Sequence, residues 1–290
     1  MRTPLAVLAA AAVVATAPLG CEPSPELTES PPGDAPRVVD ASPTDLAELP
    51  IVDLTHVFDE TTLYWPTASS TFQLEVLSAG MTEGGWHYAA NAFAAPEHGG
   101  THLDAPVHFH AGGSDAASIP LSRLVAPAVV IDVTAAAESD PDYLLTIADV
   151  EAFEAAHGRI APGSIVLLRT DWSARWPDAA GYLGDDTPGD ASNLHFPSYG
   201  AEAARLLVEE RRAAALGADV ASIDGGSSTD FQVHRIAGAA DVPLLENLTN
   251  LDRLPPVGAL VVALPMKIGG GSGGPLRAIA ILPTPGGGGS

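Results

Sequence analysis

The chain has 290 residues, with 13 Lys and Arg against 36 Asp and Glu, which gives a formal net charge of −23. Nucleic acids and anionic membranes require a basic surface on a protein partner, so this charge argues against both. Hydrophobic residues make up 46% of the sequence, enough for a packed core.

The first twenty residues have the composition of an export signal. Arg2 provides a basic start, and residues 5–17 form an apolar run that is too short to cross a bilayer. Cys21, the only cysteine, follows Leu19-Gly20 in a pattern that resembles a bacterial lipoprotein signal. We therefore predict an exported protein whose lipidated Cys21 anchors it to a membrane facing the periplasm or cell exterior. A soluble secreted product is the alternative, because Pro18 replaces the expected aliphatic residue.

Composition divides the rest of the chain into three parts. Residues 21–47 begin with Cys21 and are rich in Pro, Ser, Thr and acids, so they cannot bury a core and indicate a tether. Residues 285–290 are rich in Gly, a composition that predicts a flexible tail. One folded domain is predicted between them, over residues 48–284.

Apolar and alternating runs predict several strands along this domain. They are Ile51–Leu54, Phe72–Leu77, His87–Phe93, Val129–Val133, Ile165–Arg169, Val220–Ile223, Ala259–Leu264 and Ala278–Leu282.

Two helices are also predicted. The first begins with a capping box at Thr146 and ends at Gly158, and the second runs from about Tyr199 to Leu216, before Gly217. Strands outnumber helices and do not alternate regularly with them. The prediction is therefore a single mixed-sheet α/β domain with few helices, and neither a Rossmann fold nor a TIM barrel.

Residues 98–110 carry the strongest chemical signal. His98, His102, Asp104, His108 and His110 all occupy even positions. In an extended strand they would project from one face, while Gly99-Gly100 and Pro106 disfavour a helix. Such a cluster of imidazoles and a carboxylate suits Zn²⁺, Mn²⁺ or Fe²⁺.

Two competing motifs fail on their context. Residues 269–274 contain both G-x-G-x-x-G and G-x-S-x-G, but Pro275 and a short strand follow, and no Asp, Glu or His occurs after Ser272. We expect these glycines to form a tight turn near the site. A cysteine nucleophile is excluded because Cys21 lies outside the domain.

The segment HGGTHLDAPVHF resembles the H-x-G-T-H-x-D-x-P-x-H-F signature of the cyclase family of metal-dependent hydrolases, which includes bacterial kynurenine formamidase and isatin hydrolase. Shorter matches extend over nearly the whole domain; they include residues 53–56, 64–66, 169–172, 195–197, 222–225, 231–235 and 246–251. The resemblance implies the kynurenine formamidase-type swivelling β/β/α fold.

The resemblance also implies roles for individual residues. In the formamidase branch His98 and His102 would bind one metal ion and His234 a second, with Asp104 and Glu246 bridging them. His108 would carry the proton, and Trp65 would line the substrate pocket. Members similar to isatin hydrolase bind a single ion with a glutamine contributing, so Gln232 is a further candidate ligand. His110 falls outside the signature and is expected to support the site or to be exposed.

We therefore predict a metal-dependent, arylformamidase-like hydrolase that uses one or two Zn or Mn ions. Metal-activated water would attack an aryl amide, lactam or ester, with His108 as general acid and base. The resemblance implies a small aromatic substrate and a homodimer. The alternatives are lactam opening of the isatin hydrolase type, a lipid-tethered protein that binds a ligand without turnover, and cyclisation or dehydration in secondary metabolism.

Overall fold

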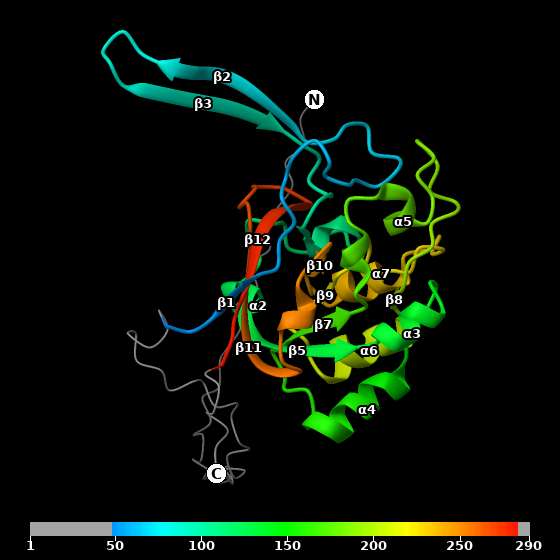
Figure 1. Ribbon diagram of the computed structural model, residues 1–290. Helices are drawn as coiled ribbons and strands as arrows, with labels where there is room; N and C mark the ends of the chain where they lie inside the picture. Colours follow the sequence, from blue (N-terminus) through cyan, green and yellow to red (C-terminus); the bar gives the residue numbers. More distant parts are fainter. Residues whose placement is uncertain (1–47, 284–290) are drawn as a thin grey trace, which may run out of the picture. The chain divides into compact units, whose positions relative to one another are not determined.

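The computed structural model contains a sheet that closes on itself (Figure 1). It describes residues 48–283, so the predictions for residues 1–47 and 285–290, lipidation of Cys21 included, lie outside the described residues. The strands pair in the order β1–β12–β11–β5–β7–β9–β10–β4, and β4 also pairs with β12. All of these strands except β1 therefore form a ring.

Parallel and antiparallel strands alternate in blocks around this ring. Strands β5, β7, β9 and β10 run parallel to one another, whereas β11, β12, β4 and β1 pair antiparallel with their neighbours. The strand bounds are β1 Ile51–Asp53, β2 Gln73–Met81, β3 His87–Ala94, β4 His102–Asp104, β5 Val125–Asp132, β6 Leu144–Leu145, β7 Ile165–Arg169, β8 Ser198–Tyr199, β9 Ala215–Ala218, β10 Leu244–Glu246, β11 Val257–Pro265 and β12 Gly273–Ile281.

Two hydrophobic cores follow from the alternation of side chains along the central strands. Val129 and Val166 belong to the core that includes residues of α4 (Ile147–His157) and α6 (Ala201–Arg205), whereas Val130 and Leu167 belong to a second core with residues from β11 and β12. Helices α4 and α6 lie along one side of β5 and β7 (Figure 1), whereas α2 (Leu121–Leu124) contributes Leu124 to the second core. This arrangement confirms the mixed α/β prediction.

The helices are short, and none within residues 48–283 has the length and apolar character needed to cross a bilayer. Their bounds are α2 Leu121–Leu124, α3 Thr134–Ser139, α4 Ile147–His157, α5 Ala179–Leu183, α6 Ala201–Arg205 and α7 Gln232–Ala239, with single turns η1 Pro106–His108, η2 Trp172–Arg175, η3 Leu206–Glu210 and η4 Leu251–Arg253. The first predicted helix is confirmed: the Thr146 hydroxyl accepts from the Asp149 N–H, and the Asp149 carboxylate accepts from the Thr146 N–H.

The second predicted helix is wrong at its C-terminal end. Helix α6 and the wider turn η3 end at Glu210, and Ala215–Ala218 forms strand β9 between β7 and β10. A buried parallel strand is apolar on both faces, so its alanines and leucine resemble the continuation of a helix. The predicted strand Val220–Ile223 is also wrong. The strand is formed by the preceding residues of β9, and Val220–Ile223 lie in the loop that follows it.

Strands β2 and β3 form a hairpin that pairs with no other strand among the described residues. In Figure 1 it extends away from the closed sheet. Both strands match the sequence prediction in position, but their side chains are largely exposed.

Candidate metal centre

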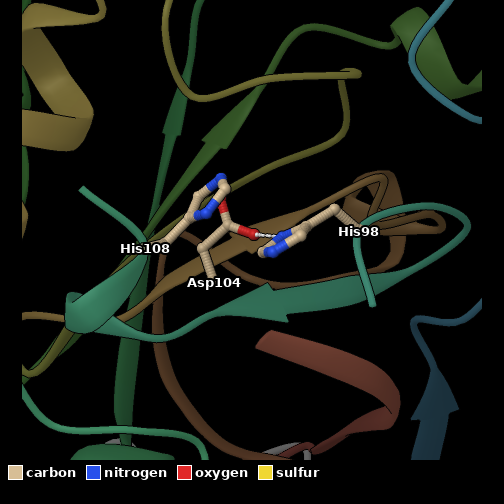
Figure 2. A group of neighbouring side chains, drawn as sticks. All are labelled: His98, Asp104 and His108. Carbon is tan, nitrogen blue, oxygen red and sulfur yellow. Dashed lines mark hydrogen bonds and ion pairs between the residues drawn. The ribbon is translucent and has the colours of Figure 1, made fainter. Parts of the chain in front are cut away.

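The predicted strand over residues 98–110 is only partly correct. Strand β4 is limited to His102–Asp104. Before it, Gly100 adopts a φ of +57°, which glycine accepts readily; after it, Pro106 begins the turn η1. His98 and His108 therefore reach the site from the segments that flank β4. Their rings stack with centroids 3.9 Å apart, next to Asp104 (Figure 2).

Asp104 lies at the centre of the group, and its two oxygens face different histidines. Oδ1 lies 2.6 Å from His98 Nδ1 and 3.1 Å from His102 Nε2. Oδ2 lies 3.0 Å from His234 Nε2. Asp104 therefore contacts three of the candidate histidines at once.

Glu246 approaches the same histidines from β10, the neighbour of β4 in the sheet. Its Oε2 lies 3.4 Å from His102 Nε2 and its Oε1 lies 3.3 Å from His234 Nε2. Cross-strand register places Glu246 directly opposite His102. The Ile223 N–H donates to Oε1 at 2.8 Å and fixes the side chain. Residues 98–104 and residues 234–246 are thus brought together, as the sequence predicted.

Two of the imidazoles are held so that one nitrogen faces the carboxylates. His102 Nδ1 lies 3.0 Å from the Gly100 carbonyl, and His234 Nδ1 lies 2.7 Å from Asp224 Oδ2. Each contact holds a proton on Nδ1, so Nε2 is the nitrogen that would offer a lone pair to a metal ion once it has lost its own proton. Such partners orient metal-binding histidines.

The electrostatics of the group favour a cation. Burial disfavours a charge on His102, but the hydrogen bond and field of Asp104, together with Glu246, outweigh it and raise its pKa to about 9. The pKa of His234 is raised for the same reasons, although burial opposes the shift. A pocket lies above the two carboxylates, and among the described residues no lysine or arginine lines it. Two buried carboxylates and imidazole nitrogens form a donor set that fits a divalent transition metal.

His108 differs from the other histidines of the group. Its side chain lines the pocket, and desolvation there lowers its pKa to about 4, with Asp104 opposing the shift. Its imidazole forms no hydrogen bond with any residue that the structure describes. It is therefore placed to exchange a proton with a bound molecule.

Two predicted candidates lie away from the group. The Gln232 side chain is exposed, and its amide donates to Asp230 Oδ2 at 2.8 Å, so the structure does not bring it to the carboxylates. His110 is exposed, two residues beyond the end of η1.

The pocket above the carboxylates has a volume of about 270 Å³. Trp65, which the resemblance places in the substrate pocket, lines it. The apolar part of the wall consists of Leu63, Tyr64, Trp65, Phe109, Leu183, Ala221 and Phe231. A flat, uncharged aromatic molecule suits such a wall.

Sequence reasoning gave no role to Asp224, which supports the site. Asp224 accepts from His234 Nδ1 and from the N–H groups of Val233 and His234 at the start of α7. Asp224 lies ten residues before His234 in the sequence. Because metal-binding histidines commonly donate to a carboxylate, a nearby acid was the signal that could have identified it.

The glycine-rich turn also belongs to the site, as expected. Ser272 Oγ lies 2.8 Å from His98 Nε2 and donates to Glu97 at 2.7 Å. A Cβ on Gly273 would lie 2.7 Å from His98 Cε1, so glycine allows the close approach.

Known proteins resemble this chain in sequence and fold. Residues 52–225 match the family model described as "Putative cyclase". Isatin hydrolase from Roseibium aggregatum is 37% identical over 204 residues, covering 68% of this chain and 76% of the relative. Kynurenine formamidase from Salinibacter ruber is 32% identical over 187 residues, covering 63% and 74%. The structure of isatin hydrolase A from Ralstonia solanacearum superimposes with a TM-score of 0.75 and 35% identity, covering 87% of this chain and all of that one.

Proposed function

This chain belongs to the cyclase family of metal-dependent hydrolases, and we propose that it opens a small aromatic lactam of the isatin type. The observation that supports this most directly is the buried group of Asp104, Glu246, His102 and His234 beneath an aromatic pocket.

The pocket wall favours a neutral lactam over N-formylkynurenine. An amino-acid substrate brings a carboxylate, which a binding site usually pairs with a lysine or arginine. The described lining contains neither, and the group already holds two buried carboxylates. A bicyclic lactam carries no charge and buries its ring against Trp65 and Phe231.

The proposed ligands are His98, His102, Asp104, Glu246 and His234, holding one or two ions of zinc or manganese. A bound ion supplies Lewis acidity, which lowers the pKa of water and polarises the carbonyl. His108 takes a proton from the attacking water. As the carbon–nitrogen bond breaks, His108 returns that proton to the ring nitrogen, and the product is an amine with a carboxylic acid, which loses its remaining proton to solvent. General acid and base catalysis of this kind contributes about 10²–10⁴ in rate.

The test uses purified protein, elemental analysis of bound metal, and assays of isatin and N-formylkynurenine before and after chelation. We expect isatin turnover that is lost on chelation and restored by zinc or manganese. His108→Ala should abolish turnover and retain the metal, while His110→Ala, an exposed histidine two residues away, should keep both. Undiminished activity in metal-free protein would contradict the mechanism, and faster turnover of N-formylkynurenine would contradict the substrate.

We also propose that the protein is exported and lipid-anchored through Cys21, on the evidence of the signal-like residues 1–20 and the tether that follows. Expression with radiolabelled palmitate should label the membrane fraction. Cys21→Ser should remove the label and release the protein, and an unlabelled wild type would overturn the anchor.

A further inference from the structure

A buried asparagine follows the proposed ligand Glu246, and both polar ends of its side chain have partners. Asn247 is 4% exposed and lines the pocket. Its Nδ2 donates to the Gly100 carbonyl at 2.8 Å, and its Oδ1 accepts from the Tyr182 hydroxyl at 2.9 Å. A carbonyl can only accept a hydrogen bond, so Gly100 selects the amide nitrogen and the orientation of the Asn247 side chain is defined.

The Gly100 carbonyl is also the group that orients His102. His102 Nδ1 lies 3.0 Å from it, so one oxygen contacts both the amide of Asn247 and the imidazole of His102. Gly100 precedes β4 and takes no part in its ladders. Glycine restricts the adjacent peptide groups less than any other residue. Asn247 therefore supplies a contact that fixes this carbonyl from outside the strand.

The register of β10 and β4 explains why a side chain makes this contact. Glu246 is the last residue of β10 and pairs with His102, so Asn247 lies where the ladder would continue. Its backbone leaves the strand with a φ of +54°, a left-handed conformation that asparagine tolerates better than most residues. The Asn247 N–H donates to the Val220 carbonyl at 2.9 Å, while the Asn247 carbonyl accepts from the Thr101 hydroxyl at 2.6 Å. The side chain is then left to reach the segment before β4.

Tyr182 in α5 holds the far end of the amide. Its side chain is fully buried, and its hydroxyl lies nearer to Asn247 Oδ1 than to the Asp219 carbonyl, which is 3.4 Å away. Burial, with the negative charges of Asp219 and Glu246, raises the pKa of Tyr182 well above its ordinary value. The hydroxyl therefore keeps its proton and donates it to Oδ1, which turns Nδ2 of the same amide toward Gly100.

These contacts form a continuous path from the pocket wall to a proposed metal ligand. The path runs from the Tyr182 hydroxyl through the Asn247 amide and the Gly100 carbonyl to His102 Nδ1. The other nitrogen of that ring, Nε2, faces the two buried carboxylates. Because an imidazole is rigid, a shift of the carbonyl that holds Nδ1 also moves Nε2.

We propose that Asn247 is a positioning residue for the metal centre. It fixes the Gly100 carbonyl and, through it, the direction in which His102 presents Nε2 to the ion, while Tyr182 holds the amide in place. The inference rests on the metal centre of the proposed function and not on the identity of the substrate.

Substitution of Asn247 tests the proposal against a matched control three residues further along the chain. Asn250 also has a left-handed backbone, with a φ of +57°, and its Nδ2 donates to the Asp53 carbonyl at 2.8 Å, away from the pocket. Asn247→Ala should lower the affinity for zinc or manganese about tenfold, the lower end of the range for partners that orient metal-binding histidines. Asn250→Ala should bind the metal as the wild type does. Chelator competition measures the affinity, and thermal unfolding of the metal-free variants checks that both fold.

The visible spectrum of bound cobalt(II) separates positioning from a general loss of stability, because it reports the arrangement of donors around the ion. The spectrum should change in Asn247→Ala and stay the same in Asn250→Ala. Tyr182→Phe deletes a single oxygen, so it also tests the path if the alanine variant does not fold. It should lower the affinity about threefold, the scale of one neutral hydrogen bond. In the Asn247→Ala background it should cause no further loss, since the hydroxyl acts through the amide.

Each outcome bears on a different part of the inference. Wild-type affinity and an unchanged cobalt spectrum in Asn247→Ala would overturn the proposal, and so would an equal loss in Asn250→Ala. Additive losses in the double variant would contradict the role of Tyr182. A wild type that binds neither zinc nor manganese would overturn the metal centre itself, whereas a wild type that binds metal and leaves isatin intact would contradict only the substrate.

Discussion

Replacing Asp224 by asparagine should weaken metal binding without removing any proposed ligand. The Asp224 carboxylate accepts three hydrogen bonds, from the Val233 N–H at 2.9 Å, the His234 N–H at 3.0 Å and His234 Nδ1 at 2.7 Å. Asparagine keeps one oxygen and presents an amide N–H₂ to the remaining donors. His234 Nδ1 must then accept, which moves the imidazole proton to Nε2, the nitrogen that faces Asp104 and Glu246.

The expected loss is one to two orders of magnitude in metal affinity, the range for partners that orient metal-binding histidines. This corresponds to about 1.4–2.7 kcal/mol. Competition titration of zinc or manganese against a chelator measures the affinity, and thermal unfolding of the metal-free protein measures any separate effect on the fold. Asp230→Asn is the matched control, since that exposed acid bonds only the Gln232 amide among the described residues.

Wild-type affinity in Asp224→Asn would refute the reasoning, because it would show that the imidazole orientation does not depend on this carboxylate. An equal loss in Asp230→Asn would refute it as well. That result would assign the effect to the general loss of negative charge near α7.

Three further predictions concern the scaffold. Burial raises the pKa of Asp219 to about 6, against hydrogen bonds from Thr170 that lower it. Because the folded state holds this proton more tightly than the unfolded chain, the free energy of unfolding should fall by about 3 kcal/mol as pH rises from about 4 to 6. Denaturant titrations of Asp219→Asn at the same pH values should show no such fall. Gly273→Ala should lower metal affinity and cost about 1–3 kcal/mol in unfolding free energy, since its Cβ would clash with the Leu103 carbonyl and His98, whereas Gly269→Ala, with open space around it, should leave both unchanged. Glu154→Gln breaks a bidentate pair with the buried Arg211 and should lower the free energy of unfolding in urea by about 3–5 kcal/mol. Glu209→Gln, which breaks an exposed pair with Arg205, should lower it by less than about 1 kcal/mol. Equal losses in the two variants would contradict the role of burial.

The chemistry of the site was more predictable from sequence than its geometry. The motif identified His98, His102 and Asp104 because imidazole and carboxylate side chains are themselves metal ligands, whatever the local backbone conformation. It could not show that β4 spans only three residues, because Gly100 and Pro106 interrupt the strand through backbone angles that the period-two pattern ignores. Family resemblance was needed for His234 and Glu246, since neither is close to the motif in the chain.

Other differences arose where tertiary context outweighs local pattern. Ala215–Ala218 becomes a strand because β7 and β10 lie on either side, not because of its own propensity. The alternation over residues 73–94 correctly predicted strands, but an alternating pattern does not specify what covers its apolar face.

Closure of the sheet by β4 determines when in folding the metal centre can exist. β4 pairs with β10 and β12, so His102 lies opposite Glu246 on one side and Pro275 on the other, partners more than 140 residues away along the chain. Such long-range pairing is slow compared with local structure. A nascent chain therefore has no site until strand β10, more than 140 residues after β4, has been synthesised and paired with it.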